Sequence, residues 1–520
     1  MAYRWMMVAL LLIAGPLAAQ PGWYREPHKD FPPSRFLHGS GIGSGADRAE
    51  RMQLAEENAR SNLIKVIRTR ISSEFLAQTT ETEQRLEAFT QSRVTSSAQL
   101  EVDGIRVERR ADQGGTAYAL AVLDRAEGQR LHRAKRERLA RELAARLAEA
   151  ERYEAAGELE LALQRYLSCY PLLAARDEAE TVLLALGDFS AAAWDELAQA
   201  TGEAWPRVSA ATVSAAVERL TGGDFASLDA VVAALAFRLG GQLPPGRAVI
   251  VLPPSYGETR FTSGFSRYLA QALAPRLAAG GWRLVERPAA FQPRSADHRG
   301  ELARQAGAEL VVSGSYVELG SSLKLFLLAT EAASGHKVGG VELTVETRLV
   351  TQAGLDIRPR NFQQALQDAG VFGQGELVGG HLQVEVWTDR GSEELYLEAD
   401  ERVTLAVRVN QPCYVRLIYH LANGRRALLY DNYYIDQAKV NHAVVLPDTF
   451  YVAPPFGVEV LQALASSEPF PALATRDWEG YLVLAEDLPQ FVAQTRGLKK
   501  QQKTRELAEM RVTLTTLPRE

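Results

Sequence analysis

Two kinds of hydrophobic periodicity divide the chain into successive regions. Residues 46–71 contain no Gly or Pro, and their apolar side chains recur at three- and four-residue steps, which predicts one face of an amphipathic helix. Residues 98–109 and 117–123 alternate apolar and polar positions, and the segment Asp112–Gly115 between them predicts a β-hairpin. With a short strand and a glycine turn before the helix, residues 21–125 are expected to form an α+β domain.

Residues 126–240 are rich in Ala, Leu, Glu and Arg and show helical periodicity almost throughout, which predicts a helical spacer. Within it, residues 149–166 resemble the helix-turn-helix of a tetratricopeptide repeat, with Gly157 at the turn and Ala162 and Tyr166 where the helices pack. One such unit is visible. A peptide-binding solenoid needs about three or more repeats, so we interpret this unit as a single helical hairpin.

An α/β pattern follows in residues 245–350. Ala248–Leu252 is a continuous apolar run ended by two prolines, which suits a strand buried on both faces. The remaining periodicities predict, in order, a helix at 265–279, a strand at 283–285, a helix at 299–305, a strand at 310–314 and a hairpin of 323–330 with 337–347. This βαβαβ order with an antiparallel ending indicates an α/β sandwich.

A Gly-rich linker at 370–380 leads into residues 380–520, which are expected to form a mainly β domain, either a sandwich or barrel-like. Asn423–Gly424 predicts a type I′ hairpin turn. The predicted strands are 382–387, 403–409, 414–419, 427–430, 442–446 and 510–516, and an amphipathic helix is predicted at 488–495. The predicted fold class is therefore a multidomain α+β protein with a C-terminal β-sandwich.

The first 19 residues have the pattern of a cleaved secretory signal. Arg4 is followed by an apolar run from Met6 to Ala14, and small residues precede an expected cleavage between Ala19 and Gln20. The run is far shorter than the roughly 20 residues of a membrane-spanning helix, and no later segment is both long and free of charge. We expect a periplasmic or outer-membrane-associated protein whose mature chain has no transmembrane segment.

Composition narrows the possible partners. The chain has 520 residues and a formal net charge of −6, and it carries no acidic or basic block that predicts a disordered tail. Bulk nucleic-acid binding is therefore disfavoured. Residues 125–146 hold eight Lys or Arg against three Glu, but their helical spacing favours a solvated helix with internal ion pairs. Cys169 and Cys413 are the two cysteines, and we interpret them as buried thiols rather than a disulfide.

Local motifs for catalysis or cofactor binding are weak. Gly41–Ala46 nearly fits a dinucleotide-binding loop, but no second βαβ strand with a ribose-binding acid follows, so a tight strand-to-helix turn is favoured. The eight histidines are scattered without a zinc-ligand spacing, and neither a Gly-x-Ser-x-Gly elbow nor a Ser-x-x-Lys dyad is present. A metal site gathered from distant positions stays open. The prediction is a protein without catalytic, cofactor or metal residues, hence not an enzyme.

Tyrosines concentrate around the Asn423 hairpin. Such clusters can stack on sugars or peptides, whereas packing between neighbouring strands is the alternative explanation. The candidate binding surface consists of Tyr414, Tyr419, Tyr430 and Tyr433.

Resemblances of three regions to known families support this division of the chain. The Gly39–Gly45 run, the helix that carries Asn58 and Ala59, and the hairpin ending at Tyr118–Asp124 resemble the Lpp-twenty family of small outer-membrane lipoproteins and the first domain of the flagellar T-ring protein. The cysteine that is lipidated in such lipoproteins is missing, so any attachment to a membrane is expected to go through partners.

Residues 248–346 resemble the family shared by the TolB amino-terminal domain, the curli-secretion protein CsgG and the lipoprotein activators of penicillin-binding proteins. The resemblance is carried by Val249–Pro253, Phe265–Leu273 and Ala308–Tyr316. It implies a binding or assembly module without catalytic residues.

The C-terminal region resembles an uncharacterised β-domain family of bacterial envelope proteins. Its carrying segments are Gln411–Tyr419, Asn423–Gly424 and Pro454–Leu464.

These features together predict an exported, non-enzymatic scaffold or assembly protein of a Gram-negative-type envelope. It is expected to bind envelope proteins and to form a homo-oligomer or ring, in flagellar, secretion or cell-wall assembly. The alternative is a peptidoglycan- or glycan-binding module that uses the tyrosine-rich C-terminal domain. An unrecognised hydrolase is a third possibility from another class.

Overall fold

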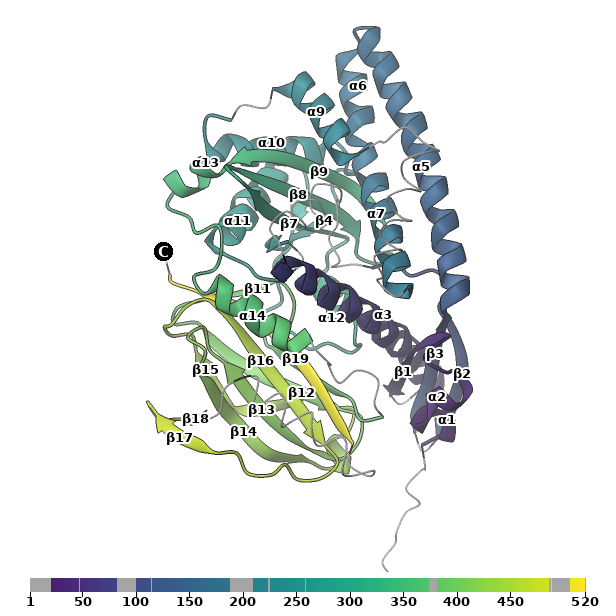
Figure 1. Ribbon diagram of the computed structural model, residues 1–520, viewed down its shortest axis with the longest axis vertical. Helices are drawn as coiled ribbons and strands as arrows, with labels where there is room; N and C mark the ends of the chain where they lie inside the picture. Colours follow the sequence, from purple (N-terminus) through teal and green to yellow (C-terminus); the bar gives the residue numbers. More distant parts are fainter. Residues whose placement is uncertain are drawn as a thin grey trace, which may run out of the picture.

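Four β-sheets, each packed against helices or a second sheet, organise the chain into a multidomain α+β protein with a C-terminal β-sandwich (Figure 1). The computed structural model describes residues 20–45, 47–81, 100–113, 115–187, 209–222, 225–257, 259–373, 381–485, 488 and 506–519. The predicted signal peptide at 1–19, including Ala19, lies outside the described residues, as does most of the predicted helix at 488–495. Gln20 is the first residue described.

The N-terminal sheet is a three-stranded antiparallel unit with order β1-β3-β2. Its strands and helices are α1 (Gly22–Arg25), α2 (Pro27–Asp30), β1 (Phe36–Ser44), α3 (Arg48–Glu81), β2 (Arg106–Gln113) and β3 (Thr116–Asp124). The long helix α3 covers one face, with Ala55, Ala59 and Leu63 fully buried against the sheet. The predicted hairpin is present, but its first strand is displaced toward the turn relative to the predicted 98–109.

The glycine run is not a turn, and this corrects the sequence prediction. Gly39, Gly41 and Gly43 all lie inside β1 and face α3. A Cβ on Gly41 would lie 2.1 Å from the carbonyl oxygen of Ala55, and one on Gly43 would lie 1.8 Å from that of Arg51. The glycines therefore remove the side chains that would hold helix and strand apart, and the helix backbone comes into direct contact with the strand.

Two amides of α3 satisfy carbonyls of β1 at this close contact. Asn58 Nδ2 donates to the carbonyl of Ile42 at 2.7 Å, and Asn62 Nδ2 donates to that of Ser40 at 2.9 Å. Buried carbonyls need such partners. Two side chains of α3 thus satisfy carbonyls of β1 that β3 does not pair with.

The helical region contains α5 (Arg125–Ala155), α6 (Leu159–Leu167), α7 (Cys169–Leu186), α9 (Ala210–Thr221) and α10 (Leu228–Gly240). The predicted helical hairpin is present, and Gly157 adopts φ 78° at its turn. Ala162 and Tyr166 are buried where α6 packs. Asp124 caps α5 by accepting hydrogen bonds from the amides of residues 126 and 127, which fixes where the helix begins.

The central sheet has order β6-β4-β7-β8-β9, and β5 pairs with β7. Its elements are β4 (Ala248–Val251), β5 (Ser255–Tyr256), α11 (Gly264–Ala279), β6 (Arg283–Leu284), α12 (His298–Ala306), β7 (Leu310–Leu319), β8 (Ser322–Glu331), β9 (Lys337–Glu346), α13 (Thr347–Gln352) and α14 (Phe362–Gly373). β4 pairs in parallel with β6 and β7, and β7, β8 and β9 are antiparallel. This is the predicted α/β arrangement.

Helices cover both faces of the central sheet. Leu325 and Leu327 of β8 pack with α10 and α11, whereas the alternate residues Phe326 and Leu328 pack with α6 and α7. The apolar run at β4 is buried on both sides, because Val249 packs with α10 and α11 and Ile250 packs with Leu302 of α12 and Trp387 of the sandwich. The helices predicted as a spacer therefore contribute to the core of the central sheet.

The C-terminal region is a sandwich of a three-stranded sheet, β10-β12-β15, and a seven-stranded sheet, β11-β19-β16-β13-β14-β18-β17. Its strands are β10 (Val384–Thr388), β11 (Leu395–Glu398), β12 (Arg402–Val409), β13 (Cys413–His420), β14 (Arg426–Ile435), β15 (Val444–Tyr451), β16 (Val458–Ser466), β17 (Thr475–Trp478), β18 (Tyr481–Leu484) and β19 (Leu507–Leu517), and a short 3-10 helix spans Gln437–Lys439. The alternation pattern missed β11, β16, β17 and β18. The predicted linker at 370–380 also begins too early, because α14 continues to Gly373.

The turn at Asn423–Gly424 is not of type I′. Gly424 has φ 79°, but Asn423 does not adopt a positive φ, and the amide of Gly424 donates to the carbonyl of Leu421 at 2.9 Å. A type I turn followed by a left-handed glycine suits the three residues between the paired Leu421 and Arg425. The loop is therefore one residue longer than the predicted two-residue turn.

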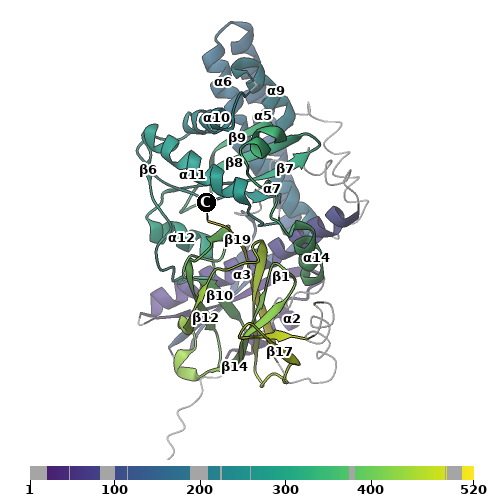
Figure 2. The same ribbon diagram turned by 90° about the vertical axis from the view of Figure 1, so that its left-hand side faces the viewer.

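The regions pack against one another. Both ribbon views place the C-terminal sandwich below the central sheet, with α3 and α12 at the boundary (Figures 1 and 2). Trp387 of β10 lies in one apolar cluster with Phe291 and Leu302, and Leu186 of α7 is buried in the core of the N-terminal unit. The ranges 21–125, 126–240, 245–350 and 380–520 stay predictions of domain boundaries, and apolar clusters extend across them.

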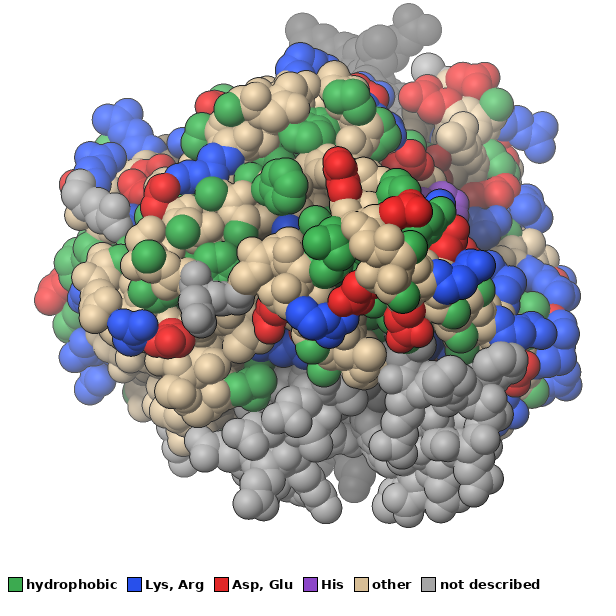
Figure 3. Space-filling model, turned by 90° about the horizontal axis from the view of Figure 1, so that it is seen from above, with side chains coloured by type: hydrophobic (Ala, Val, Ile, Leu, Met, Phe, Trp, Pro, Cys, Tyr) green, Lys and Arg blue, Asp and Glu red, His purple; other side chains and the backbone are tan. Residues whose placement is uncertain are grey.

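The basic helix and the cysteines have the environments that the sequence favours. Figure 3 shows Lys and Arg side chains gathered on the side where α5 runs, interspersed with acids. Arg130 pairs with Glu127 at 2.7 Å, and Arg146 pairs with Glu142 at 2.9 Å. Cys169 and Cys413 are free and buried. Among the described helices, none is long and apolar enough to cross a membrane.

Replacing Gly41 with Ala tests the contact between β1 and α3. The new Cβ would meet backbone atoms of Ala55 and Ala59 within 2.2 Å, so helix and strand must separate. We expect Gly41→Ala to lower the free energy of unfolding by about 3 kcal/mol or more, measured by urea denaturation of the mature chain.

Gly370→Ala is the matched control, because nothing lies within 4 Å of its new Cβ in helix α14. Alanine favours a helix over glycine by up to about 1 kcal/mol. Equal stability of the two variants would contradict close packing at Gly41.

Candidate functional site

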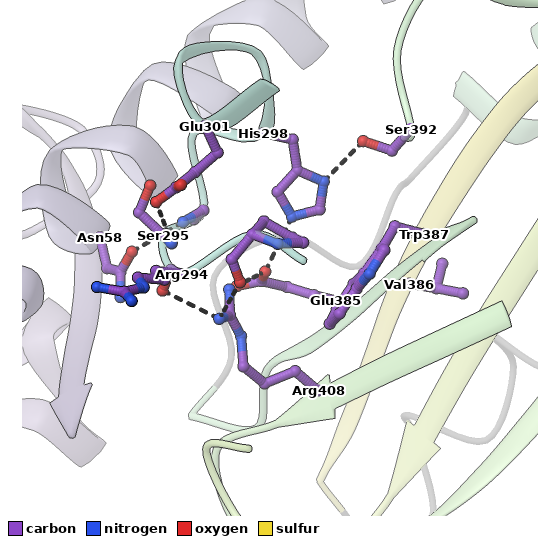
Figure 4. A network of polar contacts seen from close by, with 12 residues as sticks. Asn58, Arg294, Ser295, His298, Glu301, Glu385, Val386, Trp387, Ser392 and Arg408 are labelled. Atoms are coloured by element: carbon purple, nitrogen blue, oxygen red, sulfur yellow. Dashed lines mark hydrogen bonds and ion pairs between the residues drawn. The ribbon is translucent and has the colours of Figure 1, made fainter. Parts of the chain in front are cut away.

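A buried polar network joins the central sheet to the C-terminal sandwich (Figure 4). At its centre is Glu385 on β10. Its carboxylate accepts a hydrogen bond from His298 Nε2 at 3.1 Å and one from an Arg408 guanidinium nitrogen at 2.6 Å. His298 begins α12, and Arg408 lies opposite Glu385 on the neighbouring strand β12. One carboxylate thus connects two regions of the chain.

Burial sets the protonation states of this pair. Burial lowers the pKa of His298 despite the adjacent Glu385, so the ring is neutral near pH 7. Burial alone would raise the pKa of Glu385, but Arg408, the hydrogen bond from His298 and the nearby Lys65 hold it well below its ordinary value. A neutral ring that donates from Nε2 to Glu385 accepts at Nδ1 from the Ser392 hydroxyl, 2.6 Å away.

The same network includes backbone groups of the segment before α12. Arg408 donates to the carbonyls of Pro293 at 2.8 Å and Arg294 at 3.0 Å. The amide of Ala296 donates to Asn58 Oδ1 on α3 at 2.8 Å. Asn58 therefore bonds to β1 through its nitrogen and to the central region through its oxygen, so three regions meet here.

The loop that carries Ser392 is held by arginines of the central region. Arg287 donates to the carbonyls of Glu394 at 2.8 Å, Glu393 at 3.2 Å and Arg390 at 3.3 Å. Arg299 pairs with the Glu394 carboxylate. Burial opposes ionisation of Glu393, but Arg260, Arg68 and Arg299 lower its pKa to about 2. The loop is thereby fixed in one position.

Ser392, His298 and Glu385 are hydrogen-bonded in the order of a Ser-His-acid catalytic triad. Here Nδ1 of the histidine faces the serine and Nε2 faces the acid, whereas the serine proteases use the two nitrogens the other way round. The sequence alone does not indicate this arrangement, because the three residues belong to separate segments and form no local motif. However, Ser392 is 6% exposed and His298 is 5% exposed. A substrate can reach the hydroxyl only if the regions separate, so the burial favours a role in holding the regions together.

A fluorophosphonate probe tests this interpretation, because it labels serines activated by a histidine. We expect the folded mature protein to remain unlabelled, since the Ser392 hydroxyl is enclosed between two regions. The readout is mass spectrometry of the intact protein, with Ser392→Ala as the control. Labelling that disappears in Ser392→Ala would instead identify a hydrolase.

A second candidate site is a cavity of about 160 Å³ between the two sheets of the sandwich. Most of its wall consists of aliphatic side chains from both sheets. Its lining comprises Thr388, Leu397, Val403, Leu405, Tyr419, Leu421, Ala427, Leu429, Phe450, Tyr451, Val452, Ala453, Pro454, Glu459, Leu461, Trp478, Glu479, Tyr481, Leu514 and Thr516. The cavity thus extends from the sandwich core to the β17–β18 hairpin and the end of β15.

One buried carboxyl, Glu459 on β16, lies in this apolar wall. Its Oε2 accepts from the Tyr419 hydroxyl at 2.6 Å, and its Oε1 accepts from the amide of Ala422 at 3.1 Å. Burial raises the pKa of Glu459 to about 7, and these hydrogen bonds only partly oppose that effect. Burial, together with the neighbouring Glu459, also raises the pKa of Tyr419 well above its ordinary value.

The four predicted tyrosines do not form one surface. Tyr419, Tyr430 and Tyr433 pack against the core between the sheets, whereas Tyr414 packs against a separate cluster on the other face. Tyr430 and Tyr433 are edge-to-face, with ring centroids 5.7 Å apart, and the Tyr430 hydroxyl bonds to Asp448. Of the four, Tyr419 lines the cavity.

A metal site gathered from distant positions is not found among the described residues. Within them, no group of three or more His, Cys, Asp or Glu side chains is placed to hold a metal ion.

Comparison with known proteins adds a domain assignment. Residues 396–469, which include β12, β13, β14, β15, β16 and Glu459, match a domain of unknown function, DUF4384. No curated protein sequence matches the chain. The DUF4384 match agrees with the resemblance of the C-terminal region to an uncharacterised β-domain family.

Several solved structures are weakly similar to the chain. The LpoB C-terminal domain of Salmonella enterica is 15% identical, with a TM-score of 0.18, over 22% of this chain and 95% of that one. Escherichia coli LpoB is 16% identical, with a TM-score of 0.18, over 22% and 65%. The secreted Helicobacter pylori protein HP1454 is 11% identical, with a TM-score of 0.20, over 65% and 98%. These TM-scores are too low to carry an argument about function, and the resemblances of 21–125 and 248–346 stay predictions.

The pH dependence of stability tests the environment of Glu459. Because its pKa is about 7 in the folded protein and 4.5 ordinarily, the folded state keeps a proton that the unfolded chain releases. Its contribution to stability is full below pH 4.5 and is lost as the pH rises through 7. The difference between the two pKa values is worth about 3 kcal/mol.

We therefore expect the stability of Glu459→Gln relative to the wild type to rise by about 3 kcal/mol between pH 4 and pH 8, measured by urea unfolding. Glu479→Gln, at an exposed lining position, serves as the control and should show no such trend. A constant difference between Glu459→Gln and wild type would rule out a raised pKa.

Proposed function

We propose that this protein is an exported, non-enzymatic scaffold of the bacterial envelope. It binds protein partners through the open side of its C-terminal sandwich, by which we mean the edge of the cavity at Tyr451 and Tyr481. The observation that carries this proposal is the group of exposed apolar side chains beside the cavity. Tyr451 is 59% exposed and Tyr481 is 47% exposed. Tyr451 and Tyr481 also line the cavity.

Aromatic side chains at the edge of an apolar cavity are typical of protein–protein contacts. Exposed apolar groups are costly in water, and contiguous ones mark interaction sites. Tyrosine buries a large apolar ring and keeps a polar hydroxyl, which makes it a frequent anchor at interfaces. The edge of this cavity therefore supports binding of a partner.

The junction around Glu385 supports the scaffold part of the proposal. The buried Arg299–Glu394 ion pair and the hydrogen bond from His298 to Glu385 hold the sandwich against the central region, so a partner bound at Tyr451 meets a surface whose orientation to the other sheets is fixed. A protein that assembles others needs such a fixed geometry. The leader sequence supports export, and the family resemblances support a place in the envelope.

A glycan-binding function is supported less well by the cavity. Sugars require several polar groups around each ring, whereas the wall is mainly aliphatic and its charged groups are Glu459 and Glu479. Stacking on Tyr451 and Tyr481 is the feature that keeps this alternative open to experiment.

In-cell crosslinking followed by mass spectrometry tests the proposed function. We expect the wild type to crosslink to envelope proteins, and the double variant Tyr451→Ser with Tyr481→Ser to lose most of these crosslinks because its anchors are gone. The control is Leu159→Ser with Leu161→Ser, which removes exposed apolar groups at the tip of the α5–α6 hairpin.

A mature protein that stays monomeric and crosslinks to no envelope protein would overturn the scaffold function. Binding to purified peptidoglycan that is lost in the tyrosine double variant would establish the glycan-binding alternative instead.

A further inference from the structure

The charge of the cavity lining is one-sided. Glu459 and Glu479 are its charged residues, and the lining contains no Lys, Arg or His. Five aromatic rings surround the space, contributed by Tyr419, Phe450, Tyr451, Trp478 and Tyr481. Aromatic faces carry negative electrostatic potential and attract organic cations. Arg402 and Arg425 already lie over Tyr451 and Trp478, so the other three rings and the two carboxylates are the groups that favour a cation in the cavity.

The buried carboxyl still has room for a ligand. An ionised carboxylate offers about four acceptor positions. Tyr419 and the amide of Ala422 use two of these positions on Glu459. The other positions belong to a carboxylate that lines the cavity, with aliphatic walls such as Leu461 and Leu514 beside it.

Size limits the ligand to a short chain. The cavity of about 160 Å³ is close to the roughly 150 Å³ of an engineered apolar cavity that holds one benzene molecule. A butyl or pentyl chain fits such a space, whereas a disaccharide does not.

We infer that the cavity binds a primary ammonium group on an aliphatic stem, which is the chemistry of a lysine side chain. The stem contacts the aliphatic wall, and the ammonium donates to Glu459 among the aromatic rings. That a partner protein supplies the lysine rests on the proposed function. The recognition of the amine rests on the cavity alone.

The pH dependence separates this ligand from a neutral apolar one. Burial raises the pKa of Glu459 to about 7 in the empty cavity. A cation binds the ionised carboxylate, so its affinity rises with pH. A neutral apolar ligand desolvates the carboxyl further and binds the protonated form at least as well, so its affinity is constant or falls.

Other charged groups near the cavity do not confuse this test. The Arg402 guanidinium lies 5.4 Å from the centre of the Tyr451 ring, and that of Arg425 lies 4.4 Å from the centre of Trp478. Glu479 is exposed in the lining. Any contribution of Glu479 is measured directly by comparing Glu479→Gln with the wild type at both pH values.

The experiment compares n-pentylamine with 1-pentanol, which has the same chain and no charge, by NMR titration of the full mature protein. A carboxyl with a pKa of about 7 is roughly tenfold more ionised at pH 8 than at pH 6. We expect pentylamine affinity to rise about tenfold over this range and to exceed that of pentanol at pH 8.

Variants assign the effect to its residue. Glu459→Gln should lose both the pH dependence and the preference for the amine, whereas Glu479→Gln should keep both. Tyr419→Phe retains the carboxylate and should still prefer the amine, so it provides a second test if Glu459→Gln does not fold. Circular dichroism verifies that each variant is folded.

Two results would overturn the inference: pentanol binding as tightly as pentylamine at pH 8, or no binding of either probe. A peptide with one lysine, compared with the same peptide containing norleucine, tests a partner's side chain as the source. Loss of crosslinks with amine binding intact would contradict the scaffold function alone. Failure of the amine to bind with crosslinks intact would contradict this inference alone.

Discussion

The arrangement of the whole molecule depends on one buried carboxylate, that of Glu385. Removing a carboxylate from water costs several kcal/mol, and this cost is offset only while charged and polar partners surround it. Its partners come from different regions: Arg408 from the adjacent strand and His298 from the central region. Separating the regions would break the hydrogen bond from His298 and would part the buried Arg299 guanidinium from the Glu394 carboxylate, although Glu385 and Arg408 would stay paired. The position of the sandwich is therefore set by these polar contacts as well as by apolar packing.

The need to keep these two regions together also separates the roles of two polar clusters in the protein, the triad-like arrangement at Ser392 and the cavity at Glu459. The Ser392–His298–Glu385 chain has hydrogen bonds of catalytic type, but it lies where the regions must stay closed. The Glu459 cavity contains a less well compensated carboxyl, and it lies beside exposed aromatic rings at the open side of the sandwich. Glu459 is as buried as Ser392 and His298, so the adjoining cavity, rather than the exposure of the side chain, distinguishes the proposed binding site from the structural polar cluster.

The sequence predicts the central sheet best, because buried parallel strands are continuous apolar runs and their helices carry clear caps. It fails at β1, where the glycines allow the backbone of α3 to come into direct contact with the strand. The signal for this contact in the sequence is the row of small residues on the helix, at Ala55 and Ala59. Tyr419 was identified as a candidate, but its partner Glu459 lies 40 residues away and joins it through the pairing of β13 with β16. The signal available for Glu459 is a single acid in a mainly apolar strand.

The position of β19 has a consequence for the order of folding. This strand lies inside the seven-stranded sheet, parallel to β11 and antiparallel to β16, although it follows all the other described strands of the sandwich in sequence. Until residues 507–517 are available, β11 has no neighbour and β16 has one open edge. Open edges are sites of aberrant strand pairing. The sandwich therefore completes this sheet only after β19 has been synthesised. A chain truncated just before residue 507 would expose the strand edges of β11 and β16, to which another chain could pair.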